Sequence, residues 1–170
     1  IRRYVHLGTG NYNDSTAQLY TDCGLITCHP LMGEDATAVF NMLSGYSEPP
    51  TWNRLILAPL WLRNRCVRMI RRETARAREG KPAHIMAKMN SLCDQEIIAC
   101  LYEASCAGVK IELVVRGICC LKAGVPGLSD NISVHSIVGN FLEHARIFYF
   151  ENGGSPEVYM GSADWMPRNL

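Results

Sequence analysis

Residues 94–115, which read DQEIIACLYEASCAGVKIELVV, decide the fold class of this chain. The first part, Asp94–Ala107, places apolar residues at helical spacing and is closed by Gly108, because glycine commonly ends a helix. The last part, Lys110–Val115, has the pattern of a buried strand. An amphipathic helix that leads directly into such a strand is typical of α/β proteins.

The same alternation of helix and strand patterns continues on both sides of this stretch. A short helical turn is expected after Asn13 or Asp14. Helices are expected over residues 35–43, 62–79 and 94–107. Strands are expected over residues 4–7, 25–28, 54–58, 83–88, 110–115, 132–138, 147–150 and 158–160. Since the strands are nearly continuous in apolar residues, we expect an α/β fold with a sheet buried on both faces.

A domain boundary is predicted at Ser47–Thr51, where two prolines and small polar residues prevent regular structure. This boundary divides the chain into residues 1–50 and residues 51–170. Since the chain begins at Ile1 and stops directly after a dense polar and aromatic segment, we expect both ends to be truncated.

The composition excludes several classes of protein. The 170 residues are 48% hydrophobic and carry a formal net charge of +1, so no overall positive field favours nucleic acid or a membrane surface. No apolar run approaches the roughly 18 to 20 residues that cross a bilayer, and no secretory leader is visible. A soluble, cytoplasmic protein is expected.

Eight cysteines invite a disulfide or metal interpretation. Five of them lie among apolar residues of the expected helices and strands, which favours reduced, buried thiols: Cys66, Cys93, Cys100, Cys106 and Cys119. The cluster Cys23, Cys28 and His29 permits a zinc interpretation, but no second pair stands at zinc spacing.

The segment FLEHARIFYF, residues 141–150, carries the most informative chemistry. On a strand, residues two apart point to the same face, so His144 and Arg146 would present an imidazole and a guanidinium together. The imidazole can attack a phosphoryl group or protonate one of its oxygens, while the guanidinium neutralises the charge of that group. The small polar turn Gly161–Asp164 follows and completes a pattern suited to phosphate.

This segment resembles the second His-x-Lys box of the phospholipase D superfamily, with arginine in place of lysine. The whole chain resembles the polyphosphate kinase family through seven segments in the right order. They are residues 4–13 (YVHLGTGNYN), 19–22 (LYTD), 101–105 (LYEAS), 115–119 (VRGIC), 128–132 (LSDNI), 141–144 (FLEH) and 162–166 (SADWM).

The resemblance implies a phospholipase D-like mixed sheet flanked by helices, with the tail of one catalytic domain in residues 1–50 and most of a second in residues 51–170. It implies reversible transfer of the terminal phosphate of ATP to inorganic polyphosphate through a phosphohistidine, with Mg²⁺. The nucleophilic histidine of the family lies upstream of Tyr4, so this chain would lack it. The resemblance also implies ATP or ADP and polyphosphate as partners, and a homo-oligomer for the full-length enzyme.

The resemblance also implies roles for individual residues. Tyr20, Arg116 and His144 would contact the nucleotide, since tyrosine offers a flat face to adenine and arginine binds phosphate. Catalytic candidates are His144 and, less directly, His6, which precedes a glycine-rich loop and has a structural role as its alternative. Phosphate contacts are expected from Asn11, Lys88, Asn90, Arg146, Ser162 and Asp164. No residue is expected to bind a metal directly.

Three alternatives stay open. A phosphodiesterase or nuclease of the phospholipase D type would use His144 as nucleophile, and a non-catalytic module would only hold polyphosphate or a nucleotide. The arginines of the helix over residues 62–79 form either a solvated face or a polyanion contact. One departure from the family is Asn140, where an arginine is common, and the loss of this cation is expected to weaken polyphosphate binding.

Overall fold

The computed structural model of the chain describes residues 2–45 and 51–170. Within them, the helices are α1 (Asp14–Ala17), α2 (Pro30–Leu43), α3 (Leu62–Arg78) and α4 (Gln95–Cys106). The strands are β1 (Val5–Gly8), β2 (Tyr20–Thr21), β3 (Gly24–Thr27), β4 (His84–Met89), β5 (Lys110–Val115), β6 (Ile132–His135), β7 (Leu142–Glu143), β8 (Arg146–Phe150) and β9 (Glu157–Gly161). The expected α/β fold is confirmed.

Five strands form a mixed sheet in the order β6-β5-β4-β8-β9. The strands β4, β5 and β6 run parallel, whereas β8 is antiparallel to both of its neighbours. The carboxyl ends of β4 and β5 therefore lie at the same edge of the sheet as the beginning of β8. This arrangement gathers the segments that follow β4 and β5 around the residues that precede β8.

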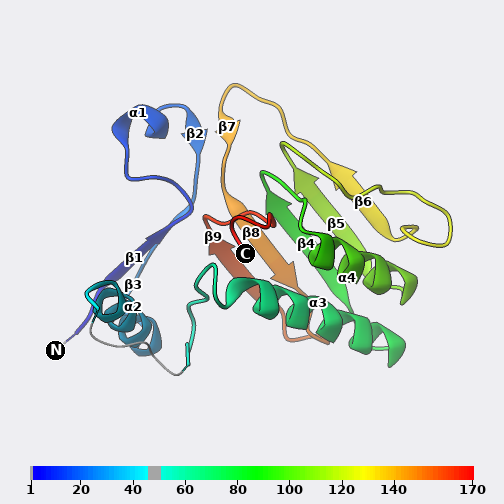
Figure 1. Ribbon diagram of the computed structural model, residues 1–170, viewed down its shortest axis with the longest axis horizontal. Helices are drawn as coiled ribbons and strands as arrows, with labels where there is room; N and C mark the ends of the chain where they lie inside the picture. The colour runs from blue at the N-terminus through cyan, green and yellow to red at the C-terminus, as the bar shows by residue number, and fades with distance from the viewer. Residues whose placement is uncertain (1, 46–50) are drawn as a thin grey trace.

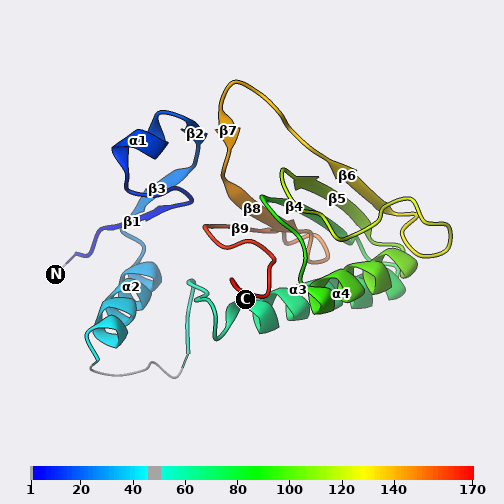
Figure 2. The same ribbon diagram turned by 45° about the horizontal axis from the view of Figure 1, so that its top comes forward.

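The helices α3 and α4 pack side by side on one face of this sheet (Figures 1 and 2). Their inner residues, such as Ile70 and Leu101, form a continuous core with Ile85, Leu113 and Phe150 of the strands. Each of these side chains is fully buried, so the core supplies the apolar burial that holds helices and sheet together.

The expectation of a sheet buried on both faces is wrong for the described residues. Burial alternates along β4, where Ile85 and Ala87 are buried beneath the helices but Met86 points to the other face and is exposed. The prediction of two covered faces arose because apolar residues stand at adjacent positions of β4, on both faces of the strand. Only the packing of α3 and α4 shows which face they cover.

The first part of the chain forms a smaller group of elements. The strands β1 and β3 pair as an antiparallel two-stranded sheet, and α2 follows them. The short β2 instead pairs in parallel with β7, so this part joins the remainder of the chain at the edge where β8 begins (Figure 1).

A strand was also expected over residues 54–58, and this prediction is wrong. Asp35 of α2 is buried, and its carboxylate accepts hydrogen bonds from the N–H groups of Asn53, Arg54 and Leu55. These N–H groups are therefore not available to a neighbouring strand. The apolar residues here line a connector (residues 51–61) that is bound to α2.

Other element boundaries differ by a few residues. The helix α2 begins at Pro30, five residues before the expected start, because proline is well suited to the first turn of a helix. The strand β6 ends at His135, where its pairing with β5 stops. The predicted boundary at residues 47–51 lies outside the described residues, apart from Thr51.

The cysteines do not follow the single pattern that was expected. All eight are free thiols, and Cys66 and Cys100 are buried. Cys106, however, is exposed at the end of α4, where its thiol lies near the carbonyl groups of Gly127 and Leu128.

Within residues 2–45 and 51–170, none of the helices has the length and apolar character needed to span a membrane.

Candidate functional site

His144 lies where the two parts of the chain meet. The N–H groups of His144 and Ala145 both donate to the carbonyl of Thr21, and the N–H of Leu142 donates to the carbonyl of Leu19. These bonds continue the β2–β7 pairing by backbone contacts alone. The segment that carries Tyr20 is thus held against the segment that carries His144.

The imidazole of His144 has two neighbours from that segment. Its Nδ1 lies 2.9 Å from a carboxylate oxygen of Asp22, and its ring lies 4.7 Å from the ring of Tyr20, tilted by 35°. The side chain of His144 is 12% exposed. An ionised Asp22 accepts a hydrogen bond from Nδ1–H, which leaves Nε2 with the lone pair and free for a ligand.

Asp22 is itself held by the glycine-rich loop. The hydroxyl of the fully buried Thr9 donates to its carboxylate at 2.8 Å, and the N–H of Cys23 donates back to that hydroxyl at 2.9 Å. A Cβ atom at Gly10 would clash with the carboxylate of Asp22. The loop therefore needs a glycine at position 10 in order to admit the partner of His144.

Arg146 does not share a strand face with His144, contrary to the expectation. The strand β8 begins at Arg146, and His144 lies before it. The guanidinium of Arg146 is buried, donates to Asp164 at 3.0 and 3.4 Å, and also donates to the carbonyl of His144 at 2.7 Å. This arrangement fixes the backbone of His144, because the guanidinium binds its carbonyl with one nitrogen and the carboxylate of Asp164 with the other two.

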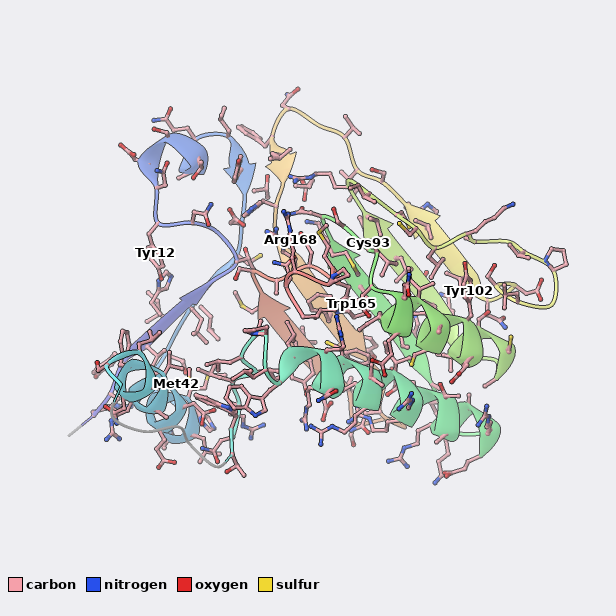
Figure 3. All side chains as sticks on the ribbon, viewed as in Figure 1. Tyr12, Met42, Cys93, Tyr102, Trp165 and Arg168 are labelled. Atoms are coloured by element: carbon pink, nitrogen blue, oxygen red, sulfur yellow. The ribbon has the colours of Figure 1, made fainter. Side chains whose placement is uncertain are left out.

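Asp164 and Asn90 belong to the same buried group. The N–H of Asn90, just after β4, donates to Asp164 at 2.9 Å. The adjacent Trp165 stacks on Phe148 with ring centroids 5.0 Å apart, and its carbonyl accepts from the N–H of Cys93, which lies close to it before α4 (Figure 3). Asp164 is thus held firmly between β8 and the end of β4.

Lys88 lies at the margin of this group. Its ammonium is 3.2 Å from the carboxylate of Glu143 and donates to the carbonyl of Ala145 at 3.0 Å. Its side chain is 20% exposed, so one of its three N–H groups can still reach an anion. The structure thus places the ammonium of Lys88, which belongs to β4, against the short segment that carries His144.

Arg116 follows β5 at the neighbouring carboxyl end. Its N–H donates to the carbonyl of Met89, and the N–H of Gly117 donates to that of Asn90, so the turns after β4 and β5 are joined. One buried nitrogen of its guanidinium has no hydrogen-bond partner among the described residues. A half-buried cation with an unused donor at this edge is suited to binding phosphate.

The remaining predicted residues lie apart from the buried group. Ser162 is exposed just after β9, whose Gly161 pairs with Arg146. Asn11 is exposed in the loop before α1. His6 is exposed on β1, and its Nδ1 forms a hydrogen bond with the hydroxyl of Tyr12. Among the described residues, no hydrogen bond or ion pair links His6 to His144.

Sequence reasoning missed Asp22 as a functional residue. It lies 122 positions from His144 along the chain, so no local spacing relates the two. The signal was present only in the segment LYTD, which places a carboxylate two residues after the tyrosine.

The described residues do not form a metal site of their own. No group of three or more His, Cys, Asp or Glu side chains among them is arranged to hold a metal ion. Asp22, Glu143 and Asp164 are each engaged by a histidine, lysine or arginine side chain. This donor set does not fit a protein-bound Mg²⁺, which requires free oxygen ligands.

Comparisons with known proteins find relatives along nearly the whole chain. Residues 1–49 match the family model described as Polyphosphate kinase C-terminal domain 1, and residues 55–170 match Polyphosphate kinase C-terminal domain 2. The chain is 59% identical to a polyphosphate kinase of Synechocystis sp., and the match covers 100% of this chain and 23% of that protein. It is 54% identical to a polyphosphate kinase of Pseudomonas aeruginosa, again over 100% of this chain, and over 25% of that protein.

A solved structure shows the same fold. The crystal structure of polyphosphate kinase from Porphyromonas gingivalis matches with a TM-score of 0.94 at 42% sequence identity, over 99% of this chain and 26% of that one. The chain thus spans about a quarter of the length of these relatives. The two family models cover nearly all of its residues, and the chain therefore belongs to the polyphosphate kinase family.

Proposed function

We propose that this chain is part of the active site of a polyphosphate kinase, which transfers the terminal phosphate of ATP reversibly to inorganic polyphosphate. The observation that carries this proposal is the contact of His144 with both Asp22 and Tyr20, which come from the other part of the chain. A carboxylate that orients an imidazole beside an aromatic ring is suited to proton transfer next to a bound nucleotide.

His144 is the proposed acid and base. Transfer of a phosphoryl group changes the charge on the bridging oxygen, and an imidazole can give or take a proton there near neutral pH. Asp22 holds Nδ1–H, so Nε2 is the atom that exchanges this proton. Asp22 also stabilises the imidazolium when His144 is protonated.

The other predicted residues either contact the substrate or hold the site in position. Tyr20 and Arg116 are proposed to hold the base and the phosphates of the nucleotide, and Lys88 is proposed to reach a phosphate oxygen. Arg146 and Asp164 are better explained as positioning residues, because they are buried and bound to each other.

Asn90, which is also buried, is likewise proposed to support the site rather than to contact phosphate. Ser162 and Asn11 remain proposed phosphate contacts, since both are exposed on loops. His6 remains a candidate with less support, because its ring is hydrogen-bonded to Tyr12.

The nucleophile of the reaction is proposed to lie in the part of the enzyme that precedes Ile1, as the family resemblance implies. When Mg²⁺ is bound to the phosphates of ATP, it supplies charge neutralisation during transfer. A metal carried by the substrate agrees with the engaged carboxylates of the site. A cytoplasmic location and a homo-oligomeric full-length enzyme remain predictions.

The substitution His144→Gln in the complete enzyme tests the proposed role. Glutamine keeps a hydrogen-bonding group of similar size but cannot exchange a proton, so we expect kcat to fall by about 10²-fold or more, with little change in KM for ATP. Steady-state kinetics of polyphosphate synthesis measure both constants. The matched control is His29→Gln, because His29 is exposed and makes no side-chain capping bond to α2.

Two results would contradict this proposal. An unchanged kcat with a many-fold higher KM would make His144 a nucleotide contact and transfer the proton role to another residue. Hydrolysis of a phosphodiester by the enzyme, without ATP and dependent on His144, would favour the phosphodiesterase alternative instead.

A further inference from the structure

A cavity of about 560 Å³ lies away from His144, where α2, the connector, the start of α3 and β9 meet. None of the predicted site residues lines it. Along β8, Arg146 pairs with Gly161, whereas Phe150 pairs with Glu157 at the cavity. Because a strand advances about 3.3 Å per residue, Glu157 lies about 13 Å along the sheet from the end that holds Arg146, and Tyr159, which also lines the cavity, lies about 7 Å from it.

Three arginines line this cavity: Arg54, Arg65 and Arg68. Among the described residues, none of them forms an ion pair with a carboxylate. The acidic lining residue Glu157 is bound to Arg72 at 2.8 Å and accepts from the hydroxyl of Tyr159 at 3.1 Å. The lining therefore carries an excess of positive charge, because its three arginines outnumber its one carboxylate, Glu157, which is bound to Arg72 and also interacts electrostatically with Arg65.

The same cavity contains donors without acceptors. The indole Nε1 of Trp52 and the Nε of Arg65 are buried and have no hydrogen-bond partner among the described residues. Buried polar groups in proteins are nearly always hydrogen-bonded, so two orphaned donors at one cavity point to an acceptor that comes from outside these residues. Trp61 also lines the cavity, and its ring packs edge to face against Trp52 at 5.6 Å.

The walls of the cavity are well fixed. The buried carboxylate of Asp35 accepts from the N–H groups of Asn53, Arg54 and Leu55 and from the side-chain amide of Asn53. These bonds hold the connector against α2. The carboxylate of Asp35 is thus already hydrogen-bonded to the connector. Arg65 and Arg68 stand three residues apart on α3, a spacing that places side chains on the same helix face.

We propose that this cavity binds a phosphorylated anion, with Arg65 and Arg68 holding its phosphate oxygens and Trp52 donating its indole N–H. Guanidinium groups bind phosphate through paired hydrogen bonds, and the cavity volume falls in the usual range for small-molecule sites. The ligand is either a nucleotide or a stretch of a polyphosphate chain, since both present the same phosphate oxygens. This site is separate from the proposed chemistry at His144.

Site-specific fluorine labelling tests the proposal. The chain has three tryptophans, so 5-fluorotryptophan is placed at Trp52, Trp61 or Trp165 in turn in the complete enzyme. Trp165 adjoins Asp164 and reports on the His144 region. Titration with ADP or with tripolyphosphate, followed by ¹⁹F NMR, is expected to shift the Trp52 and Trp61 signals with a saturable curve.

Matched double variants identify the ligand contacts. We expect Arg65→Gln with Arg68→Gln to raise the Kd read from the Trp52 signal about tenfold or more, because charge-assisted hydrogen bonds are lost. The control, Arg71→Gln with Arg78→Gln, removes the same charge from α3 at exposed positions outside the cavity, and we expect it to change this Kd less than about twofold. Far-UV circular dichroism verifies that both double variants remain folded.

The affinities for ADP and for tripolyphosphate distinguish the two possible ligands. Tighter binding of ADP than of tripolyphosphate assigns a nucleotide, and the reverse order assigns a polyphosphate chain; either supports the site. Three results would overturn it: shifts confined to Trp165, an equal loss of affinity in both double variants, or no shift at Trp52 and Trp61 in the complete enzyme. Because the readout is at Trp52, failure here leaves the proposed role of His144 unaffected.

Discussion

Asp22 connects the glycine-rich loop to the imidazole of His144. Its carboxylate accepts from Thr9, which lies 13 residues earlier in the chain, and from the imidazole of His144, which lies 122 residues later. The glycine at position 10 is required by this contact. At the scale of single residues, the position of the His144 imidazole therefore depends on Asp22 and on the glycine at position 10.

The substitution Gly10→Ala tests this dependence. Its new methyl group would clash with Asp22, which would have to turn away from His144. Because a misplacement of about 1 Å can cost about 10²-fold in rate, we expect kcat of the complete enzyme to fall by about that factor while the protein remains folded. Gly139→Ala is the matched control, since a Cβ at Gly139 has no heavy atom within 4 Å. A Gly10→Ala enzyme with normal kcat would show that Asp22 does not orient His144.

Arg116 gives a second prediction at this scale. Its guanidinium has a buried nitrogen without a partner among the described residues, so a phosphate would supply the missing acceptor. We expect Arg116→Ala in the complete enzyme to weaken ATP binding by about 1.5–3 kcal/mol, the usual loss for a charge-assisted contact. Isothermal titration calorimetry measures this affinity, with the exposed Arg78→Ala as control. Unchanged affinity would leave Arg116 with a structural role only.

At the scale of elements, Asp35 joins α2 to the connector. Burial raises the pKa of this carboxyl, but the hydrogen bonds from Arg54, Leu55 and Asn53 outweigh burial and lower the pKa below its usual value. A carboxyl whose pKa is lower in the folded state stabilises the fold when it is ionised. Its contribution is therefore present above the unfolded pKa, about 3.9, and is lost as the pH falls through the lower folded pKa.

The substitution Asp35→Asn tests this linkage. Asparagine removes the charge and one acceptor, so we expect the free energy of unfolding near pH 7 to fall by about 1–3 kcal/mol. The difference between the wild type and the variant is expected to shrink as the pH falls from about 4, where the carboxyl of the unfolded chain becomes protonated, through the lower pKa of the folded state. Urea denaturation at a series of pH values measures both curves. A difference that does not change with pH would mean that the charge of Asp35 is not what holds the connector.

At the scale of the whole molecule, the described residues leave apolar side chains uncovered on both sheets. The two-stranded β1–β3 sheet exposes Ile26 at 76%, and the open face of the main sheet exposes Val158 at 66%. A two-stranded sheet is only marginally stable by itself, and exposed apolar surface commonly marks contact with other protein. Since the chain spans about a quarter of the length of its relatives, the remainder of such an enzyme can cover these surfaces.

The isolated 170-residue chain is accordingly expected not to make polyphosphate from ATP. The family resemblance places the nucleophilic histidine and the arginines that position magnesium upstream of Ile1. Without that histidine no phosphohistidine can form, so His144 would have no phosphoryl transfer to assist. Incubation of the purified chain with ATP and Mg²⁺, followed by an assay for polyphosphate, measures this, with the complete enzyme as positive control. Substantial synthesis that is lost in His6→Ala would instead make His6 the nucleophile.

The sequence by itself determined the helices and strands of the main sheet and the family to which the chain belongs. Residues 94–115 form the expected α4 and β5 because helical periodicity and apolar strand patterns reflect local energetics. His144 and Tyr20 could be selected from the quoted segments, and the structure brings them into contact. Their roles in chemistry remain predictions.

Only the tertiary structure decided which side chains meet. The pairing of Asp22 with His144, the burial of Arg146 against Asp164 and the capture of the connector by Asp35 all join residues that are distant in the chain. Each contact depends on how β2 docks on β7, how β9 pairs with β8 or how α2 meets the connector. Periodicity in the sequence encodes which face of an element is apolar, but not which distant polar group will satisfy a buried donor or charge.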